Sequence, residues 1–147
     1  MRIALANDHV GLPLRRELEA VITGLGHEIV DFGTDGTDRV RYCDHAFPAA
    51  EAVASGDCDR AVLVCGGGIG MALAANKVAG IRAASVSDAW SARLGREHQD
   101  LNVIALGAGA VGPNNAAMIV TEFLTAEYDG GVFDGPLAAI AEYERTH

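Results

Sequence analysis

Residues 60–71 read Arg-Ala-Val-Leu-Val-Cys-Gly-Gly-Gly-Ile-Gly-Met, a short apolar run followed at once by four glycines in five positions. The apolar run predicts a strand that is buried on both faces, and a helix is expected over 72–77. A strand, a glycine-rich turn and a helix form a concave site lined by backbone N–H groups, which suits a phosphate, a carboxylate or an enolate oxygen. The Cys65 thiol, at the edge of this site, has the chemistry of a base or a nucleophile.

A purely structural role for the turn is the alternative. Glycines after a buried strand allow close packing of helix on strand, and cysteine is among the residues most often buried. The spacing Gly66-x-Gly68-x-Gly70 also fits the dinucleotide fingerprint poorly, and no acidic residue stands at a strand end about 20 residues later. A nucleotide site is therefore the weaker of the ligand-binding interpretations.

The length, charge and cysteine content limit the classes of protein to which this chain can belong. A chain of 147 residues suits one domain, and its formal net charge of −9 argues against nucleic acid and anionic membranes as partners. No apolar run has membrane-spanning length, and no signal peptide is recognised. Cys43, Cys58 and Cys65 are odd in number and lack zinc-type spacing, which predicts a cytoplasmic protein without structural disulfides or metal.

Strand and helix patterns alternate along the whole chain. Strands are predicted over 2–7, 28–32, 60–65, 81–86 and 102–106, and helices over 13–24, 44–54, 72–77, 88–98, 115–128 and 136–145. Asp44 is expected to cap the second helix, and Ser87 or Asp88 the fourth. The alternation predicts the α/β class, with a three-layer α/β/α Rossmann-like sandwich around a five-stranded parallel sheet.

Several chemically active side chains fall at strand ends. In parallel sheets with helices on both faces, ligands bind at the carboxyl ends of the strands. Asp8, His9, Cys65 and the glycine turn all belong to that edge, which favours a functional site over a packing turn. His98 ends a predicted helix, where a dipole-stabilised surface role and a proton-shuttling role are equally compatible with the spacing.

These motifs together resemble the type B ribose-5-phosphate isomerases and the related galactose-6-phosphate isomerase subunits. The resemblance runs over nearly the whole chain; its motifs are Asp8-His9-Val10-Gly11, Val30-Asp31-Phe32-Gly33-Thr34, Cys65 to Met71, Ala74-Ala75-Asn76-Lys77-Val78, Arg96-Glu97-His98 and Glu127-Tyr128-Asp129-Gly130-Gly131. So many ordered matches are specific to this family.

The resemblance implies an aldose–ketose isomerase that moves a proton between C1 and C2 through an enediolate, without metal or other cofactor. It implies that Cys65 is the catalytic base and that His98 assists opening of the sugar ring. It puts Asp8 and Tyr42 near the sugar and His9 near the phosphate. The implied anion hole for the enediolate oxygen is the backbone of Gly66, Gly67, Gly68, Ile69 and Gly70.

The chain departs from the family pattern at positions that matter for substrate binding. The family usually has Thr or Ser at position 67, Asn at 99 and Arg at 109, and it usually has Arg-His at 132–133 and Arg at 136; this chain has Gly67, Gln99, Gly109, Val132, Phe133 and Pro136. A charge-assisted hydrogen bond contributes about 1.5–3 kcal/mol, so the loss of several predicts much weaker phosphate binding. Either Arg39 replaces the missing cations, or the substrate is altered and lacks a terminal phosphate; we favour the second.

The resemblance also implies a homodimer or a dimer of dimers, because the family builds its site across a dimer interface. Residues 1–147 are expected to form one sugar-phosphate isomerase-like domain, with residues from about 130 to 147 as a C-terminal tail and helix at the subunit interface. The alternative function is a non-catalytic or weakened sugar-binding, regulatory member of the same family, which the lost arginines and Gly67 favour.

Overall fold

The computed structural model describes all residues, 1–147. Its strands are β1 (Arg2–Asn7), β2 (Glu28–Asp31), β3 (Arg60–Cys65), β4 (Ala83–Ser85) and β5 (Val103–Gly107). Its helices are α1 (Leu12–Gly24), α2 (Cys43–Ala54), α3 (Ile69–Ala75), α4 (Ala89–Gln99), α5 (Pro113–Thr125) and α6 (Asp134–Thr146), with a short 3-10 helix, η1 (Gly131–Phe133), before the last.

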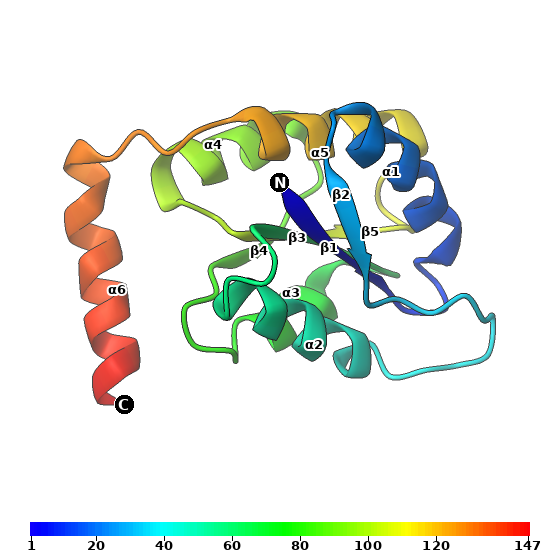
Figure 1. Ribbon diagram of the computed structural model, residues 1–147, viewed down its shortest axis with the longest axis horizontal. Coiled ribbons are helices and arrows are strands. Elements are labelled where there is room, and N and C mark those ends of the chain that lie inside the picture. Colours follow the sequence, from blue (N-terminus) through cyan, green and yellow to red (C-terminus); the bar gives the residue numbers. More distant parts are fainter.

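The five strands form one parallel sheet in the order β2-β1-β3-β5-β4. Figure 1 shows α1, α4 and α5 covering one face and α2 and α3 covering the other. The predicted three-layer α/β/α fold with a five-stranded parallel sheet is therefore confirmed. None of the helices combines the length and the apolar composition that crossing a bilayer requires.

The two faces of the sheet differ in side-chain size because residues alternate along each strand. In β1, Ile3 and Leu5 join the core under α1, α4 and α5, whereas Ala4 and Ala6 join the core under α2 and α3. The second core is rich in alanine, which lets these two helices approach the strands closely. All these residues are fully buried, so the sheet is a rigid base for the loops at its edges.

Some predicted boundaries were wrong. Helix α3 begins at Ile69, three residues before the predicted start, because Gly68 adopts a left-handed conformation (φ 75°) that turns the chain directly into the helix. Asp44 is not a cap: it lies in the first turn of α2 and pairs with Arg41 at 2.7 Å, and Tyr42 stands at the N-cap. Of the two candidate caps for α4, Asp88 holds the position and accepts the Ser91 N–H.

The C-terminal helix α6 stands away from the sheet. Figure 1 shows it joined to the body by an extended segment after α5. It has no buried residue, and it is tied to the body by a hydrogen bond in which Gly80 N–H donates to Glu144 at 2.8 Å. Ile140 and Tyr143 remain 59% and 66% exposed, so α6 shows an apolar surface that this chain alone does not cover.

Candidate active site

The candidate site lies where the chain leaves β1 and β3. These strands are neighbours, with Asn7 paired to Val64. After β1 the chain turns to α1 on one face, and after β3 it turns to α3 on the other. This divergence is the topological switch point of the sheet, where ligands bind in open α/β folds.

Cys65 ends β3 and sits under the glycine turn. The residue is only 5% exposed and lines none of the surface cavities of the single chain. Its Sγ accepts a hydrogen bond from the Gly68 N–H at 3.2 Å. An N–H aimed at the sulfur stabilises negative charge on it, as a basic or nucleophilic role requires.

The backbone around the sulfur carries unused donors. The N–H groups of Gly66, Gly67, Ile69 and Gly70 make no hydrogen bond within the chain. Gly66 and Gly70 are half-buried, and Gly67 and Ile69 are exposed at the start of α3, so these free N–H groups are open to a ligand. Such a cluster beside a thiol can hold an oxygen that becomes negative during a reaction.

Asp8 shapes the turn after β1. It is 7% exposed, and its Oδ1 accepts the N–H groups of Val10 and Gly11, both at 2.9 Å. Its other carboxylate oxygen has no partner in the chain. Gly11 is required here because a Cβ at this position would lie 2.2 Å from the Val64 carbonyl oxygen. One oxygen of Asp8 therefore builds the loop, and the other stays free for a ligand.

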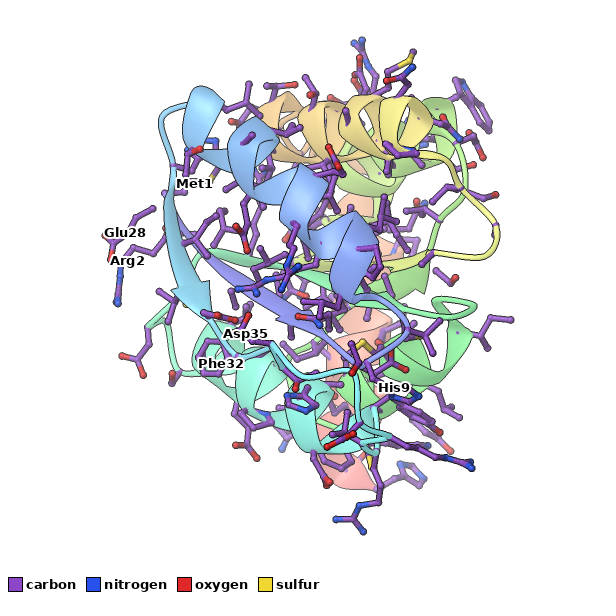
Figure 2. All side chains as sticks on the ribbon, turned by 90° about the vertical axis from the view of Figure 1, so that its right-hand side faces the viewer. Met1, Arg2, His9, Glu28, Phe32 and Asp35 are labelled. Atoms are coloured by element: carbon purple, nitrogen blue, oxygen red, sulfur yellow. The ribbon has the colours of Figure 1, made fainter.

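His9 faces the loop that follows β2. Its Nδ1 accepts the Val40 N–H at 3.3 Å, so the neutral ring carries its proton on Nε2, which is then free to donate. Figure 2 shows His9 at this end of the strands, with Arg2 and Glu28 at the opposite end. Arg39, next to Val40, is exposed and makes no hydrogen bond or ion pair within the chain.

Tyr42 reaches the glycine turn from the start of α2. Its ring lies against Gly70, where a Cβ would come within 2.9 Å of Tyr42 Cζ. The phenol is 41% exposed, so its hydroxyl remains accessible. The structure thus brings Asp8, His9, Tyr42, Cys65 and the turn to one edge.

His98 and Gln99 lie elsewhere in the chain. They end α4, which runs back across the sheet to the edge where β5 begins, opposite Cys65. The His98 ring stacks on Phe133, with centroids 4.0 Å apart and planes 17° apart. A single chain therefore does not unite His98 with Cys65.

One group of side chains has the composition of a metal site. Ligand atoms of Glu97, His98 and Asp129 lie within 4.8 Å of one another. Glu97 is already engaged, since it accepts from Arg93 at 2.6 Å. The group lies at the opposite edge from the cysteine and takes no part in the geometry around the glycine turn.

Sequence reasoning missed Asn7. This residue is fully buried at the end of β1, and its Nδ2 donates to the carbonyl oxygens of Asp8 and Thr34, both at 2.9 Å. It thereby ties the loop after β1 to the loop after β2. The available signal was its place as a polar residue ending an otherwise apolar strand.

Comparison with known proteins agrees with this architecture. A sequence profile of the ribose/galactose isomerase family matches residues 3–140. The chain belongs to the ribose/galactose isomerase family. Within this family it is 44% identical to the putative sugar phosphate isomerase YwlF of Bacillus subtilis, with the match covering 100% of this chain and 99% of that protein.

Two further family members support the assignment. Ribose-5-phosphate isomerase B of Escherichia coli is 43% identical, over 98% of this chain and 97% of that one. The solved ribose-5-phosphate isomerase B of Clostridium thermocellum superposes with a TM-score of 0.96 at 44% identity, covering 99% of this chain and 98% of that chain. The expected family and isomerase class are confirmed, and the chain is an isomerase of this family.

Proposed function

We propose that this chain interconverts an aldose and a ketose, a small sugar or sugar phosphate of the ribose 5-phosphate/ribulose 5-phosphate type, with Cys65 as the base. The observation that carries the proposal is the Cys65 sulfur beside the unpaired N–H groups of Gly66, Gly67, Ile69 and Gly70. General bases contribute typically 10²–10⁴-fold to such reactions.

In the proposed reaction, the Cys65 thiolate removes the proton from C2 of the open-chain aldose. The electron pair of the C–H bond forms the C1=C2 double bond, and the carbonyl oxygen on C1 becomes negative. The free N–H groups of the turn hold that oxygen. The hydroxyl proton on O2 then passes to O1, and the thiol returns its proton to C1, which leaves the carbonyl at C2. No redox partner is needed.

Other residues bind the sugar in this proposal. The free oxygen of Asp8 and the Tyr42 hydroxyl contact sugar hydroxyls, and His9 donates from Nε2 toward the far end of the substrate. Gln99 lies next to His98, which opens the ring. Because His98 lies at the opposite edge of its own chain, it acts on the sugar held beside Cys65 of a second copy.

This arrangement requires a homodimer or a dimer of dimers. Support comes from large apolar side chains left exposed: Ile69 (71%), Leu73 (58%) and Trp90 (69%), with Ile140 of α6. Exposed apolar groups of this size mark association surfaces when they are contiguous. In the proposal, the tail from about residue 130 to 147 packs at the subunit interface. The free cysteines suit a cytoplasmic setting.

We also propose that the substrate is altered, without a terminal phosphate. On the loops at the site edge, Arg39 and Arg41 are the only arginines or lysines, and Arg41 is paired with Asp44. At Gly109, Val132, Phe133 and Pro136, where the resemblance implies cations and a histidine, the chain offers none. Should the substrate be phosphorylated after all, Arg39 is the cation in reach.

Replacement of the base tests the proposed function. Cys65→Ala should lower kcat by about 10²–10⁴-fold with the fold retained, and deuterium from solvent should enter the wild-type product at the transferred position. Cys58→Ala is the matched control, because Cys58 is buried before β3 and away from the turn. Ligand-induced thermal stabilisation without turnover across phosphorylated and free sugars would instead support the regulatory alternative.

A further inference from the structure

A cavity of about 350 Å³ lies beside the glycine turn. It is an open hollow between the start of α1 and the loop between β5 and α5. Its lining residues are Val10, Pro13, Leu14, Glu17, Ala108, Gly109, Val111 and Pro113. The volume falls within the range of small-molecule sites, which is about 300–1,000 Å³.

The cavity borders the candidate active site at Gly66. A Cβ on Gly66 would lie 3.5 Å from Val10 Cγ1, and Gly109 N–H donates to the Gly66 carbonyl at 3.0 Å. Gly66 directly follows Cys65. A sugar held by the free N–H groups of the turn would therefore have Val10 and Gly109, which line the cavity, next to its far end.

The lining is apolar and has one charged group. No arginine, lysine or histidine lines the cavity, and Glu17 is exposed at its rim without an ion pair. A phosphate would find no cation here and one unneutralised carboxylate. An uncharged apolar group that bound here would move from water into contact with valine, leucine and proline side chains, which is favourable.

The backbone conformation at position 109 does not require glycine. Its φ is not in the left-handed region, and its Cβ would meet a single atom, the Gly66 carbonyl oxygen, at 3.2 Å. Its effect is instead to leave open the space that a side chain would fill. In this it differs from Gly68, whose φ of 75° requires glycine.

We propose that this cavity binds an uncharged apolar substituent at the end of the sugar remote from C1 and C2, such as a 5-deoxy or 5-O-alkyl pentose. The inference rests on the proposed function for the placement of the sugar. The altered substrate is then a pentose that carries an alkyl group in the place of the phosphate of ribose 5-phosphate.

The test compares ribose 5-phosphate with 5-O-methyl, 5-O-ethyl and 5-O-propyl ribose. All four lack a free 5-hydroxyl and so share the furanose and open-chain forms. Binding is measured by calorimetry and turnover by product formation. Wild-type protein should bind 5-O-methyl ribose at least about tenfold more tightly than ribose 5-phosphate. Each added methylene should tighten binding by roughly fourfold until the cavity is full.

Two variants should shift the preference toward ribose 5-phosphate. Gly109→Arg fills the cavity with a cation, so ribose 5-phosphate should bind at least about tenfold more tightly and 5-O-propyl ribose at least about tenfold more weakly. Glu17→Gln leaves the shape intact and should strengthen ribose 5-phosphate binding about threefold at low salt, with no effect on the neutral sugars. Gly24→Arg is the matched control, since Gly24 ends α1 in open space with no left-handed φ.

The outcomes separate the two proposals. Tighter wild-type binding of ribose 5-phosphate, or equal binding along the alkyl series, overturns the inference and leaves the isomerase proposal standing. Absence of turnover for every sugar overturns the proposed function, while the binding order still decides the inference. If Gly109→Arg does not fold, the alkyl series and Glu17→Gln decide it.

Discussion

Replacing Gly68 by alanine tests how the glycine turn is built. At Gly68 the backbone is left-handed (φ 75°), and a Cβ would lie 2.9 Å from the Leu106 carbonyl carbon and 3.0 Å from the Gly107 nitrogen. The left-handed conformation costs a residue with a Cβ about 1–2 kcal/mol. Overlap with backbone atoms of β5, which cannot rotate away, adds about 1–3 kcal/mol. Gly68→Ala should therefore lower the free energy of unfolding by about 2–5 kcal/mol.

Urea denaturation at one fixed protein concentration measures this loss, with a midpoint lower by roughly 1–2.5 M for an m-value of about 2 kcal/mol per M. Two glycines serve as controls. Gly26 has φ 82° and open space, so Gly26→Ala should show the conformational cost alone, about 1–2 kcal/mol. Gly67 has open space and no left-handed φ, so Gly67→Ala should be neutral or stabilising by about 0.4–1 kcal/mol.

The three variants are ranked by how far each lowers the free energy of unfolding. If Gly68→Ala lowers it no more than Gly26→Ala does, contact with β5 does not constrain the turn. If Gly68→Ala and Gly67→Ala change the free energy of unfolding equally, neither the left-handed backbone nor the contact with β5 requires glycine at position 68. Alanine keeps the N–H that donates to Cys65 Sγ, but a turn displaced by its Cβ would move this N–H away from the sulfur. If Cys65 is the base, kcat should therefore also fall in Gly68→Ala and remain near wild type in Gly26→Ala.

Three further predictions follow from buried or paired groups. Phe123→Ala should lower the free energy of unfolding by about 3–5 kcal/mol in urea, because the ring is fully buried with the Arg60 guanidinium 5.6 Å from its centre. Burial raises the pKa of the Cys58 thiol, so in folded protein at neutral pH this residue should resist N-ethylmaleimide, and peptide mass mapping showing its ready modification would contradict this. Burial and a hydrogen bond to Asp134 raise the pKa of Tyr128 to about 12. Since this lies above the unfolded value of about 10, the stability it contributes is intact below pH 10 and is lost toward pH 12; ultraviolet titration of wild type and Tyr128→Phe should show one late-ionising tyrosine.

The sheet could be predicted from the sequence because its strands are short apolar runs separated by clear turns. β1 was predicted to the residue, and β3 to its last residue, Cys65. The start of α3 could not be predicted, because Gly70 lies within the helix and glycine is a poor helix former. β4 proved shorter than predicted, Ala83–Ser85 against 81–86, since it pairs with β5 alone at the edge of the sheet.

Part of the site geometry also follows from topology alone. Parallel strands place Asp8, His9 and Cys65 at one edge whatever their side chains do. The contact of Tyr42 with Gly70 depends on the course of residues 33–42, which carry no periodic pattern. The stack of His98 on Phe133 depends on how the tail returns past α4, and local patterns do not encode that path.

The projecting C-terminal segment bears on how this protein changes over evolutionary time. Val132 is 84% exposed, and no residue of α6 is buried within the chain. Mutations between 132 and 147 therefore leave the packing around the five strands intact. Natural variation there is therefore limited by what this segment contacts outside its own chain and not by whether each chain folds. Sequences that share this sheet can therefore differ widely in this segment without losing the fold.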